Sequence, residues 1–159
     1  QWKRYIGNAE FESLKAGGLD FVRMPIDPAP FLSDASAALQ DRLYDEVTAA
    51  VDLALEAKLN VLVDIHPIPA GERTIGTSEI LKDAEKFEAY LTFLRRIAAS
   101  IKDKDPKQVA LEVFNEPTID CDSDGASIDE RIARNAAFLL KLDNGIERRS
   151  GRLAPDAGP

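Results

Sequence analysis

The feature that most constrains the fold is an alternation between short apolar segments and longer segments with helical periodicity. Three apolar segments, "LDFVRMP" (19–25), "NVLVDIHP" (60–67) and "QVALEVF" (108–114), are rich in β-branched and aromatic residues and predict strands. The second is almost continuously hydrophobic, which is typical of a strand in a parallel sheet with both faces covered. Parallel strands need long crossover connections, and helices usually provide them.

Helical patterns fill the intervals between these segments. A short helix over 9–18, ending at Gly17-Gly18, precedes the first strand, and an amphipathic helix is predicted over 41–58. The next helix carries one apolar stripe, formed by Phe87, Tyr90, Leu91, Leu94, Ile97, Ala98 and Ile101. Ser127 and Glu130 have the spacing of a capping box and predict a helix that runs to about Leu142. The order α-β-α-β-α-β-α indicates an α/β fold with parallel strands.

Chain length bears on which α/β fold this is. A complete (β/α)8 barrel takes about 250 residues and eight strands, whereas this chain has 159 residues. Periodicity alone does not separate an open doubly wound sheet from part of a barrel. We expect one domain over residues 1–142 and a poorly ordered tail over 143–159, where Gly, Pro and scattered charge replace apolar periodicity.

Charge and composition exclude several function classes. The formal net charge of −8 argues against nucleic acid as a partner. No apolar run approaches the ~18 residues of a membrane span, so we expect no membrane partner. The chain does not begin with Met and its first residues lack the apolar core of a signal peptide, so we expect a processed form or a fragment.

One segment has part of a metal-binding pattern. "DCDSDG" (120–125) places Asp at positions one, three and five and Gly at position six of a calcium loop. Such a loop needs a bidentate Glu at position twelve, where this chain has Arg131. We therefore interpret the segment as a solvated acidic loop and expect neither a metal nor a cofactor.

Polar residues occur where each predicted strand ends. Arg23 lies at the end of the first strand, His66 at the end of the second and Asn115-Glu116 after the third. The carboxyl ends of parallel strands share one edge of the sheet, where ligands bind, so these residues are expected to converge. Structural roles are the alternative: Arg23 pairing with Asp27 or Asp64, and His66, the one histidine, as a satisfied core group.

These strand ends resemble those of a known family. "GLDFVRMPIDP", "NVLVDIHP" and "LEVFNEP" resemble, in order, the second, third and fourth strand ends of family 5 glycoside hydrolases, the cellulase family of (β/α)8 barrels. The resemblance covers roughly residues 8 to 140. It implies a partial barrel of about three to four parallel βα units, half of a TIM barrel.

The resemblance also implies a role for each residue. Glu116 matches the general acid/base, which protonates the glycosidic oxygen and later deprotonates water. Asn115 matches the amide that binds the sugar 2-hydroxyl, and Arg23 matches the arginine that supports the nucleophilic carboxylate. His66 matches a substrate-binding histidine. Phe31, in the Pro-rich loop after Arg23, is the expected side chain for stacking on a sugar.

The second carboxylate of the expected site is not evident. A retaining mechanism needs a nucleophile about 5–5.5 Å from the acid/base, and in this family it comes from the seventh strand. After residue 142 the sequence predicts no strand, and Glu147 lies in the predicted tail. The leading hypothesis is a retaining endo-β-1,4-glucanase in a truncated or half-barrel form. One alternative is a catalytically silent half-barrel that at most binds β-glucan, and another is an unrelated α/β domain.

Two further expectations concern partners and location. Uncovered strand edges and an apolar barrel interior favour a homo-oligomer, with β-glucan polysaccharide or oligosaccharide as the ligand. The family implies a secreted or periplasmic protein.

Overall fold

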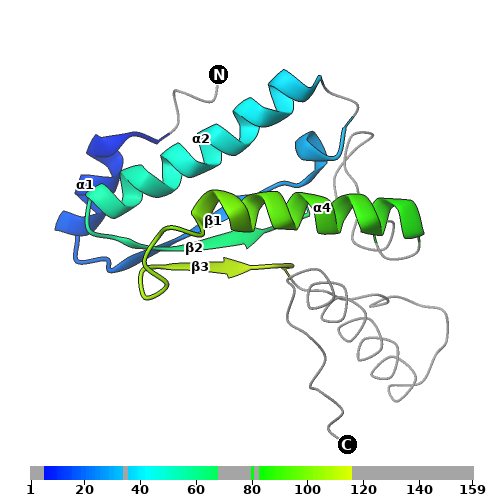
Figure 1. The fold of residues 1–159 in the computed structure, drawn as a ribbon. Helices are drawn as coiled ribbons and strands as arrows, with labels where there is room; N and C mark the ends of the chain where they lie inside the picture. Colours follow the sequence, from blue (N-terminus) through cyan, green and yellow to red (C-terminus); the bar gives the residue numbers. More distant parts are fainter. Residues whose placement is uncertain (1–5, 34–35, 68–79, 81–82, 116–159) are drawn as a thin grey trace, which may run out of the picture.

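The computed structural model describes residues 6–33, 36–67, 80 and 83–115 (Figure 1). Four predictions lie outside these residues: the role of Glu116, the acidic loop 120–125, the helix from Ser127 to Leu142 and the tail 143–159.

The described residues form one parallel sheet of three strands in the order β1-β2-β3. The strands are β1 (Phe21–Ile26), β2 (Asn60–Ile65) and β3 (Val109–Glu112). Phe21 pairs with Asn60 at one end of the sheet, and Asp64 pairs with Glu112 towards the other. All three predicted strands are confirmed, each within a few residues of its predicted bounds.

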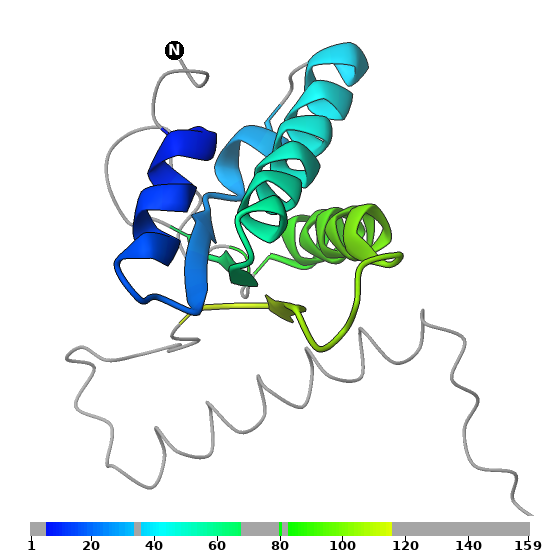
Figure 2. The same ribbon diagram turned by 90° about the vertical axis from the view of Figure 1, so that its left-hand side faces the viewer.

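Helices cover one face of this sheet, as Figures 1 and 2 show. They are α1 (Asn8–Ala16), α2 (Ala37–Glu56) and α4 (Ala84–Ile101), and a short 3-10 helix, η2 (Ala29–Phe31), follows β1. Each strand is thus joined to the next by a segment that contains a helix, as predicted. The helix η2 was not predicted, because its sequence, "APF", follows Pro25 and Pro28 in a segment with turn signals and is too short to show helical periodicity.

Side chains and backbone groups at the helix ends explain where the long helices begin and stop. Asp83 caps α4, with its Oδ1 accepting from the backbone N–H groups of Glu85 at 2.9 Å and Lys86 at 3.0 Å. The Lys86 bond contributes most to lowering the pKa of Asp83. At the end of α2, Lys58 N–H donates to the Leu55 carbonyl and Leu59 N–H to the Ala54 carbonyl, the two bonds of a Schellman motif.

The core lies between the helices and the sheet. Side chains with no exposed surface come from α2, α4, β2 and the residues next to them: Val51, Ala54, Leu59, Val63, Ile65, Ile80, Tyr90 and Ile97. The stripe predicted for α4 needs two corrections. Ala98 is exposed, and Phe93, which the stripe omitted, is only 2% exposed. Phe93 is buried because a ring from η2, Phe31, packs 5.0 Å from it, a contact that periodicity within one helix does not reveal.

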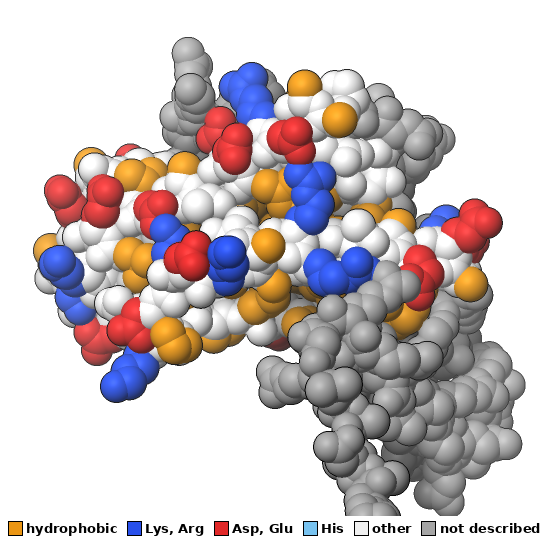
Figure 3. Space-filling model, viewed as in Figure 1, with side chains coloured by type: hydrophobic (Ala, Val, Ile, Leu, Met, Phe, Trp, Pro, Cys, Tyr) orange, Lys and Arg blue, Asp and Glu red, His pale blue; other side chains and the backbone are white. Residues whose placement is uncertain are grey.

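The two faces of the sheet differ in character. In β1, Val22, Met24 and Ile26 pack against the core, whereas Phe21 is 60% exposed on the face away from the helices. Arg23 and Glu112 interact across that face, which none of the described helices covers and which we call the open face. Figure 3 shows acidic and basic side chains interspersed on the surface of the helical side. Among the described helices, none is long and apolar enough to cross a membrane.

Candidate active site

The carboxyl ends of the three strands bring the predicted site residues together. Arg23 lies within β1, three residues before its last residue Ile26 and not at the strand end as predicted. His66 follows β2 directly, and Asn115 lies just beyond β3. The sheet hydrogen bonds continue past the strands, because His66 N–H donates to the Ile26 carbonyl at 2.9 Å and Asn115 N–H donates to the Ile65 carbonyl at 2.8 Å. The backbone ladder therefore fixes where the His66 and Asn115 side chains start.

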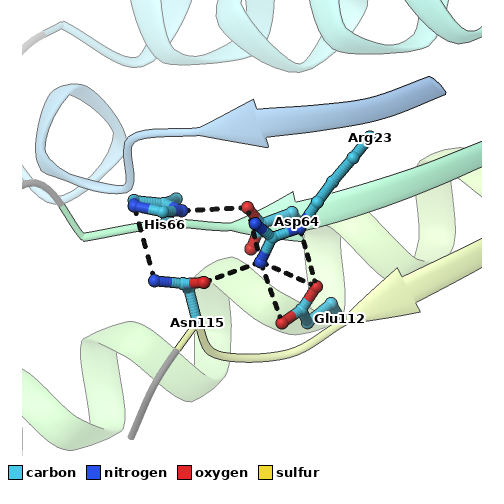
Figure 4. A network of polar contacts seen from close by, with 5 residues as sticks. All are labelled: Arg23, Asp64, His66, Glu112 and Asn115. Carbon is cyan, nitrogen blue, oxygen red and sulfur yellow. Dashed lines mark hydrogen bonds and ion pairs between the residues drawn. The ribbon is translucent and has the colours of Figure 1, made fainter.

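Arg23 is the centre of the polar network in Figure 4. Its Nε and Nη2 donate to the two carboxylate oxygens of Glu112 at 3.1–3.2 Å, in the fork-shaped geometry that binds carboxylates most strongly. Nη2 also donates to Oδ1 of Asn115 at 2.6 Å and lies 3.2 Å from Oδ2 of Asp64. One guanidinium on β1 thus contacts side chains from β2, from β3 and from just beyond β3.

Asp64 is the buried member of this network. Its side chain has no exposed surface, and its Oδ2 lies 3.2 Å from Nη2 of Arg23 and 3.0 Å from Nδ1 of His66. Within the described part of the chain, its other oxygen, Oδ1, has no hydrogen-bond partner. Burial and, to a lesser extent, the charge of Asp64 raise the pKa of Tyr90, whose hydroxyl donates to the Val113 carbonyl at 2.7 Å. Tyr90 therefore stays neutral and serves as a structural donor under the end of β3.

A fourth contact closes the network into a ring. Nδ2 of Asn115 lies 3.4 Å from Nε2 of His66, which completes the sequence Arg23, Asp64, His66, Asn115 and back to Arg23. The side chains of Arg23 and His66 are 42% and 32% exposed, so the ring can be reached from solvent. The ring joins a permanent cation, a buried carboxylate, an imidazole and an amide in one polar cluster.

Two members of the network were not predicted as site residues. The pairing of Asp64 with Arg23 was one of the alternatives drawn from the sequence and is confirmed, whereas the contact of Asp64 with His66 was not predicted. Glu112 was not considered at all. Both are charged residues inside otherwise apolar strands, a signal that could have found them. The pairing of Arg23 with Glu112 could not be found in this way, because it depends on the strand register. That register pairs Asp64 with Glu112 and places Arg23 two residues before the β1 partner of Asp64.

Phe31 lies in the core, away from this ring. It is 7% exposed, and its ring centroid is 4.9 Å from that of Tyr44 and 5.0 Å from that of Phe93. Core packing therefore occupies the aromatic side chain that was expected to stack on a sugar, and we assign Phe31 no stacking role.

Glu116, which follows Asn115, lies outside the described residues. Within those residues, no cluster of three or more His, Cys, Asp and Glu has the arrangement of a metal site.

Comparison with known proteins identifies the family. The family model described as cellulase, glycosyl hydrolase family 5, matches residues 1–137. The chain belongs to glycoside hydrolase family 5. A curated relative, the xyloglucan-specific endo-β-1,4-glucanase of Bacteroides ovatus, is 40% identical over 57 residues, which are 35% of this chain and 11% of that protein.

Solved structures of family 5 enzymes share the fold. Cel5A of Thermotoga maritima, in complex with mannotriose, matches with a TM-score of 0.59 and 25% identity over 92% of this chain and 43% of that one. The Bacteroides ovatus family 5 xyloglucanase, in complex with a XXXG heptasaccharide, matches with a TM-score of 0.61 and 25% identity over 89% of this chain and 30% of that one. The chain thus spans less than half the length of these family 5 structures, and its strands and helices form part of a (β/α)8 barrel.

Proposed function

We propose that this family 5 chain carries the acid/base half of a retaining site that cleaves β-1,4-linked glucan. The observation that carries the proposal is the ring formed by Arg23, Asp64, His66 and Asn115 at the carboxyl edge of the sheet. Ligands of (β/α)8 barrels bind at this edge. Glu116, next to Asn115 in the sequence, is the proposed general acid/base.

The hydrogen bonds within the ring suit the proposed roles. Oδ1 of Asn115 accepts from Arg23 at 2.6 Å, which leaves the Nδ2 group to donate to a sugar hydroxyl. His66 is proposed to bind the substrate through Nε2. Nη1 of Arg23 makes no hydrogen bond to any described residue, and we propose that it supports the nucleophilic carboxylate.

The nucleophile itself is proposed to come from outside the described residues. A retaining site needs a second carboxylate about 5–5.5 Å from the acid/base. The two carboxylates of the network, Asp64 and Glu112, are both paired with Arg23, and Asp64 is also fully buried. Neither has the free, exposed oxygen that attack on a sugar carbon requires.

The proposal is tested by substituting Glu116→Gln and measuring release of reducing sugar from a soluble β-glucan. Removing a general acid/base costs about 10²–10⁴-fold in rate, so turnover should fall by that factor while the far-UV circular dichroism spectrum stays unchanged. Glu46→Gln is the matched control, because Glu46 lies on α2 in an exposed ion pair with Arg42. Turnover that survives Glu116→Gln would contradict the assignment of the acid/base.

A glucan-binding protein without catalysis is the second candidate function. The described part of the network favours it, because its two carboxylates, Asp64 and Glu112, are both paired with Arg23 and neither is placed as a nucleophile. In this case the 159-residue chain binds a cello-oligosaccharide in calorimetry but releases no reducing sugar, and Asn115→Ala weakens the binding. A chain that neither binds nor cleaves the glucan would contradict both candidate functions.

Two coarser proposals concern the setting of the protein. We propose a secreted or periplasmic location, since a polymeric β-glucan is met outside the cell. We also propose that copies of the chain associate through the open face of the sheet, where Phe21 is 60% exposed.

A further inference from the structure

The contacts of the ring have a direction that can be assigned atom by atom. Arginine carries only hydrogen-bond donors, so the Asn115 atom that lies 2.6 Å from Nη2 of Arg23 must be the carbonyl oxygen. The amide nitrogen of Asn115 then points the other way, towards Nε2 of His66. Arg23, a cation whose charge does not change with pH, therefore fixes the orientation of the Asn115 amide.

The other side of the ring fixes the proton of the imidazole. Oδ2 of Asp64 lies 3.2 Å from the Arg23 guanidinium, and an ionised carboxylate paired in this way only accepts hydrogen bonds. Nδ1 of His66, 3.0 Å from the same oxygen, must then carry the hydrogen and donate it. Nε2 of a neutral imidazole with this tautomer is an acceptor.

The contact between Asn115 and His66 is an independent check on both assignments. The contact of Asn115 with Arg23 makes Nδ2 of Asn115 a donor. The contact of His66 with Asp64 makes Nε2 of His66 an acceptor. The two requirements meet in one contact of 3.4 Å and agree. A histidine with its hydrogen on Nε2 would instead place two donors against each other there and would leave Nδ1 facing a carboxylate without a hydrogen.

We propose that Asp64 is a positioning residue that fixes the Nδ1–H tautomer of His66. Asp64 has no exposed surface and cannot touch a ligand, whereas the His66 side chain is 32% exposed. The site thereby presents an acceptor at Nε2 of His66, which a ligand hydroxyl takes by displacing the long 3.4 Å contact with Asn115, beside an N–H of the Asn115 amide. A hydroxyl group donates one hydrogen bond and accepts others, so this pair is matched to a sugar hydroxyl. Only that last step rests on the proposed function.

The tautomer can be measured directly because His66 is the one histidine of the chain. The experiment is ¹⁵N–¹H correlation spectroscopy of the imidazole in the full 159-residue chain, without ligand and at alkaline pH, where imidazole is neutral. Protonated and unprotonated ring nitrogens resonate far apart. We expect a protonated Nδ1 and an unprotonated Nε2 in the wild-type chain. The opposite pattern would overturn the proposal, and neither result depends on catalytic activity.

Two variants separate Asp64 from the other neighbour of the imidazole. Asp64→Leu removes the acceptor at Nδ1, so the imidazole should exchange between tautomers and both nitrogens should move to intermediate shifts. Asn115→Ala removes only the weak donor at Nε2, so the Nδ1–H pattern should persist. Loss of the pattern in Asn115→Ala would overturn the role of Asp64, as would its persistence in Asp64→Leu. If Asp64→Leu does not fold, the wild-type and Asn115→Ala spectra decide the question.

Discussion

At the scale of single residues, Arg23 links stability to the site. Its guanidinium contacts Glu112 in β3, Asn115 just beyond β3, and Asp64 in β2. The pair with Glu112 is partly solvated, since the Glu112 side chain is 31% exposed, whereas Asp64 is fully buried. Breaking a buried pair from one side costs far more than breaking a solvated one, because a charge remains behind without its partner.

Arg23→Met is therefore expected to lower the free energy of unfolding by on the order of 2 kcal/mol, since it leaves the Asp64 carboxylate buried without a cation. The measurement is urea denaturation followed by circular dichroism. Adding Asp64→Leu to Arg23→Met should restore part of the loss, because it removes the stranded charge. Arg42→Met, at an exposed ion pair with Glu46, is the control and should change stability by less than about 0.5 kcal/mol. A double variant as unstable as the sum of its single changes would contradict this account.

At the scale of elements, hydrophobic patterning predicted the strands and the long helices because burial on one side imposes its period on the sequence. It predicted Tyr90, Leu94 and Ile97 correctly but not Phe93, whose partner Phe31 comes from a separate element. The pair of Arg23 and Glu112 is 89 residues apart in sequence and depends on the strand register. Local patterns predict that strand ends meet, and they do not predict which charged side chains pair there.

The end of α2 provides a prediction at this scale. Lys58 occupies the left-handed position of the Schellman motif, with φ of 64°. The left-handed conformation costs a non-glycine residue about 1–2 kcal/mol. Glycine avoids this cost, but the greater conformational entropy that it gives the unfolded chain cancels about 0.5–1 kcal/mol of the gain. Lys58→Gly should therefore raise the free energy of unfolding by about 0.5–1 kcal/mol in urea denaturation.

The matched control is Lys102→Gly at the end of α4, where φ is −58° and glycine gains nothing. That variant should be neutral or less stable than the original chain. Equal effects of the two substitutions would mean that the backbone conformation of Lys58 does not limit stability.

At the scale of the whole molecule, the described helices all lie on one side of the sheet. The open face carries both the pair of Arg23 with Glu112 and the exposed side chain of Phe21. The polar ring lies at the carboxyl end of the strands. Towards the other end, an open hollow of about 160 Å³ is lined by residues that include Phe21, Leu62 and Ala110. In a complete (β/α)8 barrel this side of the strands faces the packed interior. Contact of this exposed apolar surface with a second apolar surface is therefore more favourable than its contact with water.

If copies of the chain associate through this face, the mass in solution measured by light scattering should exceed 17.4 kDa and rise with concentration. Burying a Phe side chain is worth about 1.5–3 kcal/mol, and a symmetric pair buries two. Phe21→Lys should consequently weaken dimerisation on the order of 100-fold or more and return the mass to that of one chain.

Leu39→Lys is the matched control, since Leu39 is 50% exposed but lies on α2, on the helical side. A mass of 17.4 kDa at every concentration, or equal effects of the two lysines, would show that the open face does not hold copies together. Because the hollow and the polar ring lie at opposite ends of the strands, Phe21→Lys should leave the His66 tautomer unchanged, which separates association from the organisation of the site.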